Sequence, residues 1–227
     1  MSAGSPHGSE VEARSMGRVD RLVHRVLRAI LEGFCRVFWR LHVEGRDRLP
    51  VAGPFILAPV HRSNVDFAIA GAAVPRVMRF MAKNSVWKYP RIGRFLERMG
   101  TFPVDRSRAD RGALRNCERA LAQGDPVVMF PEGRRRDGDE VVDLLEGPAW
   151  VACRNRVPIV PVGLGGTDRA MPIGAKLIRP VKIHVVIGEP IYPDVPLEGR
   201  VPRAAVAGLT EQLRLAVHQR YDEARRA

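Results

Sequence analysis

A histidine and an aspartate stand five residues apart, at the point where an apolar run of the sequence stops. The run PFILAPV, residues 54–60, is followed directly by His61, and Asp66 precedes a second apolar stretch. This pattern predicts a buried strand that leads into a helix, with Ser63 or Asn64 as the helix N-cap. Asp66 would lie in the first turn of that helix, from where its carboxylate can reach the His61 ring. A carboxylate on one imidazole nitrogen fixes the tautomer and leaves the other nitrogen available as a base.

The sequence supplies no nucleophile for this pair. Ser63 is better explained as a helix cap, and no other serine or cysteine is placed beside the two residues as in a hydrolytic triad. The nucleophile would then be a hydroxyl group of the substrate. On its own the pair leaves two interpretations open, because a histidine near an aspartate is more often structural than catalytic.

Two further polar clusters follow apolar runs. The segment GTFPVDR, residues 100–106, ends in Arg106, and FPEGRRR, residues 130–136, places Glu132 and Gly133 in a turn before three arginines. Glycine lets backbone amides approach a ligand, and guanidinium groups present planar donors to phosphate oxygens. A single loop arginine is usually a solvated charge, but three polar clusters after three predicted strands indicate a site.

Strand and helix patterns alternate along the chain after Pro50. We expect strands within residues 54–60, 77–83, 126–133, 157–164 and 181–191, and an extended segment at 100–106. We expect helices within residues 64–74, 93–100, 109–124, 147–156 and 203–227. The alternation predicts one α/β domain over residues 46–227, with a mainly parallel sheet flanked by helices. Ligands of such sheets lie beyond the carboxyl ends of the strands, where the polar clusters stand.

The region before this domain divides into two parts. Residues 1–16 are polar and rich in Gly and Ser, which predicts a disordered tail and no signal peptide. Residues 17–45 repeat apolar side chains at three- and four-residue steps, with arginines outside the stripe. We expect an amphipathic helix that lies in a membrane interface, or one that packs on its own domain with solvated arginines. No apolar run reaches the roughly 18 residues that a membrane span needs.

The composition of the chain restricts the classes of partner that the protein can bind. Lys and Arg number 37 against 25 Asp and Glu, which gives a formal net charge of +12 and favours anionic partners such as nucleic acid, an anionic membrane or a phosphorylated small molecule. The aromatic share is only 6%, and aromatic residues do not interleave with a basic run, which argues against nucleic acid. Neither the histidines nor the cysteines show metal-ligand spacing, so we predict no metal site. We expect Cys35, Cys117 and Cys153 to be small buried apolar residues.

The order of four motifs makes the interpretation specific. The segments HRSNVD, GTFPVDR, FPEGRRR and VPIVPVGL resemble the four blocks of the glycerolipid acyltransferase family typified by 1-acyl-glycerol-3-phosphate acyltransferase. The resemblance spans about Pro50 to Gly188, and residues 82–100 resemble the family's linker between its first two blocks.

The resemblance implies a membrane-associated enzyme without a cofactor. It would move a fatty acyl group from acyl-CoA or acyl carrier protein to the free hydroxyl of lysophosphatidic acid, giving phosphatidic acid. His61 matches the family's base and Asp66 its partner. The positions that match the family's acceptor-binding residues are Arg106, Glu132, Gly133, Arg135 and Lys83. Pro158 and Pro161 match the fourth block, which is linked to the acyl side.

One departure leaves the acceptor open. The family usually has threonine after Glu-Gly, and this chain has Arg134. Glycerol-3-phosphate, another lysophospholipid or a hydroxylated lipid without phosphate therefore remain alternative acceptors. A basic lipid- or nucleic-acid-binding protein and a catalytically silent relative are the alternatives outside the enzyme class. The family's membrane-anchoring first helices imply a peripheral or monotopic location on the cytoplasmic face of the cell membrane.

Overall fold

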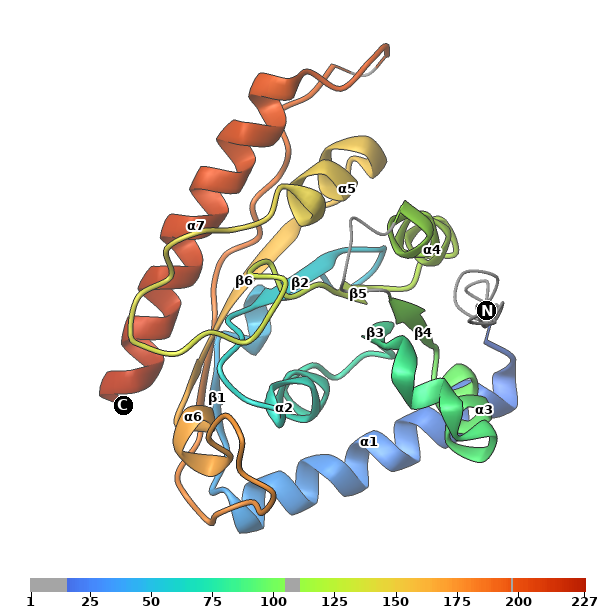
Figure 1. Ribbon diagram of the computed structural model, residues 1–227. Coiled ribbons are helices and arrows are strands. Elements are labelled where there is room, and N and C mark those ends of the chain that lie inside the picture. The colour runs from blue at the N-terminus through green and yellow to red at the C-terminus, as the bar shows by residue number, and fades with distance from the viewer. Residues whose placement is uncertain (1–15, 105–110, 197) are drawn as a thin grey trace, which may run out of the picture.

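A computed structural model describes residues 16–104, 111–196 and 198–227 of the chain (Figure 1). The strands are β1 His42–Glu44, β2 Ile56–Pro59, β3 Phe80–Lys83, β4 Thr101–Val104, β5 Val127–Val128, β6 Ile159–Gly165 and β7 His184–Ile187. The helices are α1 Arg18–Phe38, α2 Asp66–Ala73, α3 Pro90–Arg98, α4 Arg111–Ala122, α5 Gly147–Asn155, α6 Thr167–Ala170 and α7 Arg203–Arg226. Two short 3₁₀ helices span Arg46–Arg48 and Asn84–Lys88. The predicted disordered tail, residues 1–16, lies outside the described residues except for Met16.

The central sheet has the strand order β1-β7-β6-β2-β5. Adjacent strands of this sheet are parallel, except that β6 and β7 are antiparallel to each other. Strands β3 and β4 form a second, parallel pair, and a bridge between Arg79 and Val127 connects this pair to the edge of the central sheet. The prediction of one α/β domain with a mainly parallel sheet is confirmed.

Strands β2 and β6 are the centre of the fold. Every residue of both strands is buried, as expected for continuous apolar runs covered on both faces. Figure 1 shows α7 on one side of these strands and α2, backed by α1, on the other. The turn that follows β2 therefore lies between two helical layers, α7 on one side and α2 with α1 on the other.

Helix α7 lies unusually close to β6. A Cβ atom added at Gly163 would be 2.0 Å from the carbonyl oxygen of Arg220, and one added at Gly165 would be 2.0 Å from that of Ala224. Only glycine allows this backbone approach. The buried side of α7 repeats at helical spacing, through residues such as Leu209, Leu213 and Val217.

The predicted helix of residues 17–45 is too long. Helix α1 ends at Phe38, Arg40 has a φ of 46°, and the chain then forms β1, which pairs with β7. The Trp39 side chain is buried and its indole N–H donates to the carbonyl of Arg179 at 2.9 Å. This anchor turns the chain into the sheet, so residues 42–44 belong to the domain that we had placed from residue 46 onward.

The prediction of a side-chain cap on α2 is also wrong. Helix α2 begins at Asp66 with Val65 at the N-cap position and no side-chain cap hydrogen bond. The Ser63 hydroxyl instead donates to the carbonyl of Met171 at 2.8 Å. The carboxylate of Asp66 accepts backbone N–H groups of the turn, so the turn is organised from inside the helix rather than by a cap before it.

Candidate active site

His61 and Asp66 meet at the carboxyl end of β2. Nδ1 of His61 lies 2.8 Å from Oδ2 of Asp66. Their side chains are 8% and 0% exposed. The contact that the spacing predicted is present in the structure, while its role in catalysis stays a prediction.

The turn itself orients Asp66. The same oxygen, Oδ2, also accepts the backbone N–H of Arg62 at 2.6 Å and that of Ser63 at 2.7 Å. Because a carboxylate oxygen accepts in this arrangement, Nδ1 of His61 carries the proton. The other ring nitrogen, Nε2, then holds a lone pair and can act as a base.

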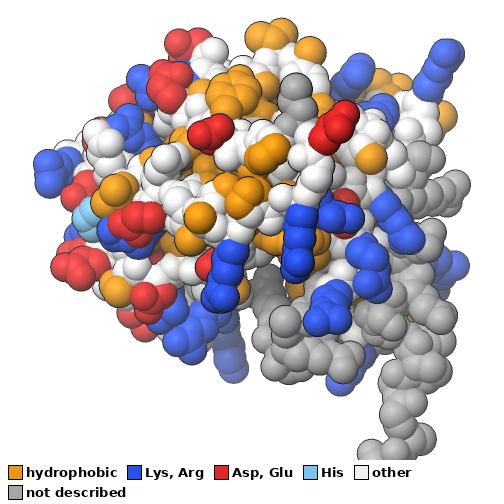
Figure 2. Space-filling view, turned by 90° about the horizontal axis from the view of Figure 1, so that it is seen from above, with side chains coloured by type: hydrophobic (Ala, Val, Ile, Leu, Met, Phe, Trp, Pro, Cys, Tyr) orange, Lys and Arg blue, Asp and Glu red, His pale blue; other side chains and the backbone are white. Residues whose placement is uncertain are grey.

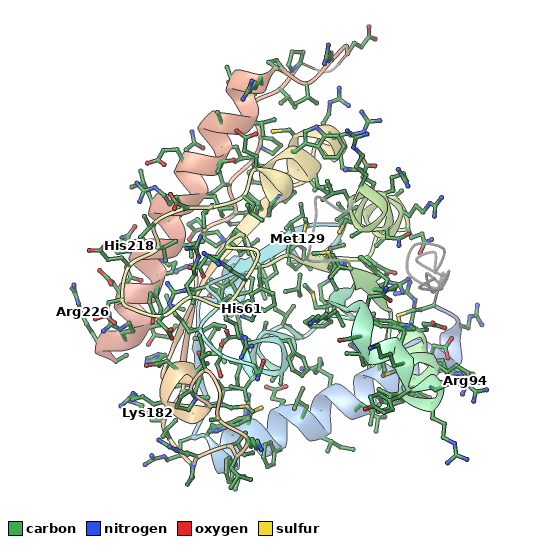
Figure 3. The ribbon with its side chains drawn as sticks, viewed as in Figure 1. His61, Arg94, Met129, Lys182, His218 and Arg226 are labelled. Carbon is green, nitrogen blue, oxygen red and sulfur yellow. The ribbon has the colours of Figure 1, made fainter. Side chains whose placement is uncertain are left out.

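The ring of His61 is also fixed from its face. It stacks on Phe130, with ring centroids 4.1 Å apart and an angle of 26° between the rings. Across residues 16–104, 111–196 and 198–227, no hydrogen bond to Nε2 is present. Figure 3 places His61 near the middle of the molecule. An oriented imidazole with one available nitrogen is the arrangement that general base catalysis requires.

Glu132 lies behind His61 in a buried ion pair. Its Oε2 accepts the backbone N–H of His61 at 2.7 Å, and its two oxygens accept Nη1 of Arg62 at 2.6 and 2.8 Å. Both side chains of the pair are almost completely buried. The family resemblance implied that Glu132 binds the acceptor. In the structure its carboxylate connects the Glu132–Gly133 turn to the backbone of the turn after β2, and acceptor binding stays a prediction.

Arg62, like Phe130, is a residue of this site that the sequence did not identify. Its remaining N–H groups donate to the carbonyls of Gly138 at 3.0 Å and Glu140 at 2.9 Å, and its guanidinium lies 4.9 Å from the centre of the Tyr221 ring. Burial raises the pKa of Tyr221, against an opposing effect of Arg62. An arginine in a loop of a basic protein is usually solvated, so only its place next to His61 could have indicated this role.

The turn that carries Glu132 depends on Gly133. Its φ is +68°, and an added Cβ would lie 2.4 Å from Cδ1 of Leu145. The Gly133 N–H donates to the carbonyl of Phe130 at 3.0 Å, which closes the turn. Arg134 is exposed and Arg135 is half-buried just after it. The turn therefore presents basic side chains next to the buried carboxylate.

The remaining predicted residues are distributed around this turn. Lys83 is exposed at the carboxyl end of β3. Arg106 lies outside the described residues. Pro161 is buried in β6 beside Ala58 of β2, and Pro158 precedes β6. The structure thus brings His61, Asp66 and Glu132 together, and the roles of the others stay predictions.

No cysteine competes with the substrate as nucleophile in the described part of the chain. Cys35, Cys117 and Cys153 are buried and free, as predicted. Burial raises the pKa of Cys35 to about 11 and also raises the pKa values of the other two thiols. Thiols with such values stay protonated at neutral pH and are poor nucleophiles.

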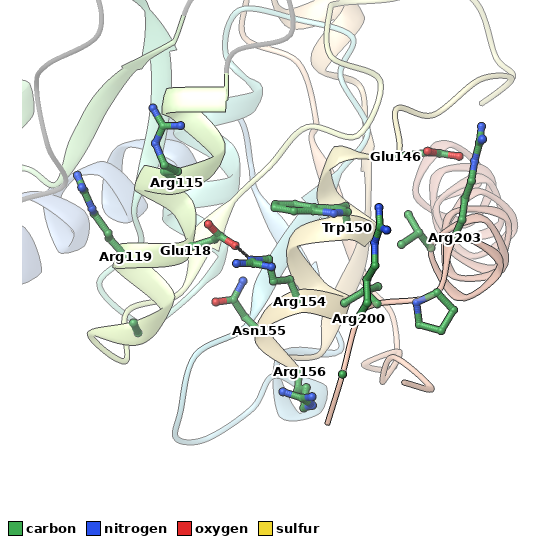
Figure 4. A pocket seen from close by; sticks show the side chains of 15 residues that line it. Arg115, Glu118, Arg119, Glu146, Trp150, Arg154, Asn155, Arg156, Arg200 and Arg203 are labelled. Carbon is green, nitrogen blue, oxygen red and sulfur yellow. Dashed lines mark ion pairs between the residues drawn. The ribbon is translucent and has the colours of Figure 1, made fainter. Parts of the chain in front are cut away.

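A basic groove lies apart from this turn. Its volume is about 1350 Å³, and α4, α5 and the start of α7 form its walls. Six arginines line it with Trp150 (Figure 4): Arg115, Arg119, Arg154, Arg156, Arg200 and Arg203. Figure 2, seen from above, shows Lys and Arg side chains around this face, with several close together to the right of the centre. None of the groove residues belongs to the His61 or Glu132 turns, so we do not assign it to the same site.

Comparisons with known proteins show which family and which fold this chain shares. The family described as Acyltransferase matches residues 40–165. A 1-acyl-sn-glycerol-3-phosphate acyltransferase of Bacillus subtilis is 30% identical over 151 residues, which cover 66% of this chain and 73% of that protein. The chloroplastic 1-acyl-sn-glycerol-3-phosphate acyltransferase LPAT1 of Arabidopsis thaliana is 28% identical over 159 residues, 68% of this chain and 44% of that longer protein. The crystal structure of the 1-acyl-sn-glycerophosphate acyltransferase PlsC of Thermotoga maritima has a TM-score of 0.67 at 23% identity and covers 86% of this chain and 81% of its own, which shows a shared fold.

Proposed function

The chain belongs to the acyltransferase family, and from this premise we propose that it acylates the free hydroxyl of lysophosphatidic acid. The donor would be a fatty acyl thioester, on coenzyme A or on acyl carrier protein, and the product phosphatidic acid. The names of the Bacillus and Arabidopsis relatives support this acceptor. The observation that carries the proposal is the His61–Asp66 hydrogen bond at the end of β2, which leaves Nε2 available.

In the proposed mechanism the acceptor hydroxyl is the nucleophile. Nε2 of His61 takes the hydroxyl proton while the oxygen attacks the thioester carbonyl carbon. The tetrahedral intermediate collapses, the carbon–sulfur bond breaks, and the leaving thiolate takes the proton from the imidazolium. Asp66 stabilises the imidazolium between these steps, as a buried carboxylate beside Nδ1 does. No acyl-enzyme forms.

Basic side chains would position the acceptor phosphate. Arg106, Arg135 and Lys83 match the family positions for this task, and Arg134 adds a further cation after the Glu132–Gly133 turn. Correct positioning of reactants contributes roughly 7–11 kcal/mol to catalysis, as much as general base help or more. We therefore expect loss of a phosphate ligand such as Arg106 to be as damaging as loss of His61.

The base assignment is tested by His61→Ala in the full-length protein. Release of free thiol from acyl-CoA and from acyl carrier protein is followed with lysophosphatidic acid as acceptor. We expect a loss of roughly 10²–10⁴-fold in kcat, the usual contribution of a general base. His218→Gln, an imidazole on α7, is the matched control and should retain the wild-type rate. A near wild-type rate in His61→Ala would show that the base is another group.

The acceptor is tested with a small panel. Lysophosphatidic acid, glycerol-3-phosphate, a neutral lysophospholipid and a monoacylglycerol are compared in the same thiol assay. We expect the phosphate monoesters to have the lowest KM. Arg134→Thr restores the usual residue of the family and should raise the KM of the phosphate monoesters more than it changes kcat. Equal rates with monoacylglycerol would reject phosphate recognition while leaving the base assignment intact.

We further propose that α1 docks the enzyme on a membrane surface. No helix among the described residues is long and apolar enough to cross a bilayer. The outer face of α1 nevertheless exposes a continuous apolar stripe of Val19, Leu22, Val23, Val26, Ile30, Phe34 and Val37. Charged residues of the same helix contact the domain: Arg21 pairs with Asp125 at 2.9 Å, and Glu32 pairs with Arg46 at 2.9 Å. An apolar outer face with flanking cations is typical of helices that lie in a membrane interface.

The docking proposal is tested by sedimentation with vesicles that contain anionic phospholipid. The double variant Ile30→Ser with Phe34→Ser removes two exposed apolar side chains from the middle of α1 and should lower the bound fraction by several-fold. Leu215→Ser, at an exposed apolar position of α7, is the control and should bind like the wild type. Equal binding of all three proteins would contradict the role of α1.

A further inference from the structure

Three potential metal ligands meet on the edge of the central sheet. Strands β1 and β7 are parallel, with His42 beside His184 and Glu44 beside Val186. Residues two apart on a strand point to the same face, so both side chains of β1 lie on the face that also carries His184. The sequence spacing did not indicate a site, because one of the ligands comes from a strand 140 residues further on.

The three ligand atoms lie at coordination distances from one another. Oε1 of Glu44 is 2.9 Å from Nε2 of His184 and 3.5 Å from Nε2 of His42, and all three atoms lie within 4.8 Å of one another. A tetrahedral Zn²⁺ with bonds of about 2.0–2.1 Å separates its ligand atoms by about 3.3 Å. The two imidazole rings are perpendicular, with centroids 4.7 Å apart, and both of their Nε2 atoms approach the same oxygen, Oε1 of Glu44.

The three side chains differ in exposure in a way that suits ion entry. The His184 side chain is 7% exposed, whereas those of His42 and Glu44 are 59% and 54% exposed. Nδ1 of His184 is buried without a hydrogen-bond partner among the described residues, so Nε2 is the nitrogen that faces the cluster. His184 would be the fixed ligand. The exposed side chains of His42 and Glu44 could turn from solvent toward an ion without rearrangement of the sheet.

The charges around the cluster also allow a cation. Burial lowers the pKa of His184, and neutral imidazole is the form that binds metal. A nearby cation, Lys182, lies just before β7. Its Nζ donates to the carbonyl of Ala227 at 2.8 Å, at the end of α7 (Figure 3). The carboxylate of Glu44 supplies a negative charge inside the cluster.

We propose that His42, Glu44 and His184 bind one Zn²⁺, with a water molecule as the fourth ligand. Two imidazoles and a carboxylate form a donor set that Zn²⁺ accepts, and closely related ions such as Co²⁺ occupy the same geometry. The ion would connect β1, a three-residue edge strand, to β7. Since β1 directly follows α1, the metal would fasten the N-terminal helix to the sheet. The site is independent of the reaction at His61.

The experiment is a titration of the metal-free full-length protein with Zn²⁺ and with Co²⁺. Calorimetry should give one Zn²⁺ per chain, and Co²⁺ should develop the visible absorption of a tetrahedral complex. Zn²⁺ should also raise the melting temperature, because an ion that binds only the folded state stabilises it. Loss of a metal ligand should weaken binding by at least the roughly 10–100-fold that loss of an outer-shell partner costs.

Two variants and one control separate this site from other histidines. His184→Gln removes the buried ligand, and His42→Ala removes an exposed one without disturbing the core. Both should lose the cobalt spectrum and the zinc-dependent rise in melting temperature. His218→Gln removes a histidine outside the cluster and should keep both. Absence of zinc binding in the wild type, or wild-type affinity in His42→Ala, would overturn the proposal.

Discussion

Two histidine–carboxylate pairs of this protein have nearly the same length and opposite surroundings. His61 and Asp66 approach to 2.8 Å, and His184 and Glu44 to 2.9 Å. At the first pair the carboxylate is completely buried and its Oδ2 accepts three N–H groups. At the second the imidazole is buried, and the carboxylate is more than half exposed.

The comparison shows that burial of the carboxylate decides what each pair can do. Asp66 is held by the backbone and can only orient the ring of His61, which suits a base that must keep one tautomer. Glu44 can leave its histidine and turn toward an ion from solvent. The same two residue types would therefore serve the general base that we propose at one end of the sheet and the metal site that we propose at its edge.

Among the changes that test this comparison, Asp66→Asn has the largest expected effect. The amide keeps the shape of the side chain but offers N–H groups where the turn needs an acceptor, so the ring loses its fixed tautomer. We expect kcat to fall by roughly 10²–10⁴-fold, the range of a general base contribution. The measurement is thiol release with lysophosphatidic acid. A fall in kcat below tenfold, in a variant with the wild-type melting temperature, would mean that Asp66 does not control the base.

Glu132→Ala should mainly cost stability. It leaves the guanidinium of Arg62 buried without its carboxylate, and breaking such a pair costs about 3–5 kcal/mol. Urea unfolding measures this loss. Glu211→Ala is the control, because it removes a carboxylate from an exposed pair with Arg214 and should change the free energy of unfolding only slightly. Equal losses in both variants would show that the buried pair is not needed to hold the site.

Gly133→Ala should have a smaller effect. A side chain at φ of +68° costs roughly 1–2 kcal/mol, and the new methyl group must also displace Leu145. Gly53→Ala is a matched control, because its φ is +76° but nothing lies within 4 Å of the added Cβ. The excess loss of stability in Gly133→Ala, with a change in acceptor KM, measures how tightly the turn is packed. Identical losses would show that Leu145 moves without cost.

The smallest expected effect is on the pH dependence of the free energy of unfolding, through His184 of the pair with Glu44. Burial lowers the pKa of His184 in the folded chain. The unfolded chain therefore binds more protons as the pH falls below about 6.5, and the free energy of unfolding decreases in that direction. Measured with a chelator present, His184→Gln should flatten this dependence. His24 contributes in the same sense, because its pKa is also lowered by burial. An unchanged slope in His184→Gln would show that His184 titrates alike in both states.

Local patterns in the sequence predicted most of the helices and strands and one contact of the site. The alternation of apolar runs and helical periodicity predicted the α/β domain, because both periodicities are properties of single segments. The five-residue separation of His61 and Asp66 lies within one turn, so their contact could be anticipated. The strand β1 was missed because it has only three residues and because Leu41, just before it, continues the apolar spacing of α1.

Only the tertiary structure decided the contacts between distant segments. The ion pair of Arg62 with Glu132 joins residues 70 positions apart, and the cluster of Glu44 with His184 depends on the register of β1 on β7. The sequence alone does not distinguish a charged residue that is buried in an ion pair from one that is exposed to water. Which of the two it becomes depends on the packing of the whole sheet, and no local pattern of the chain records that.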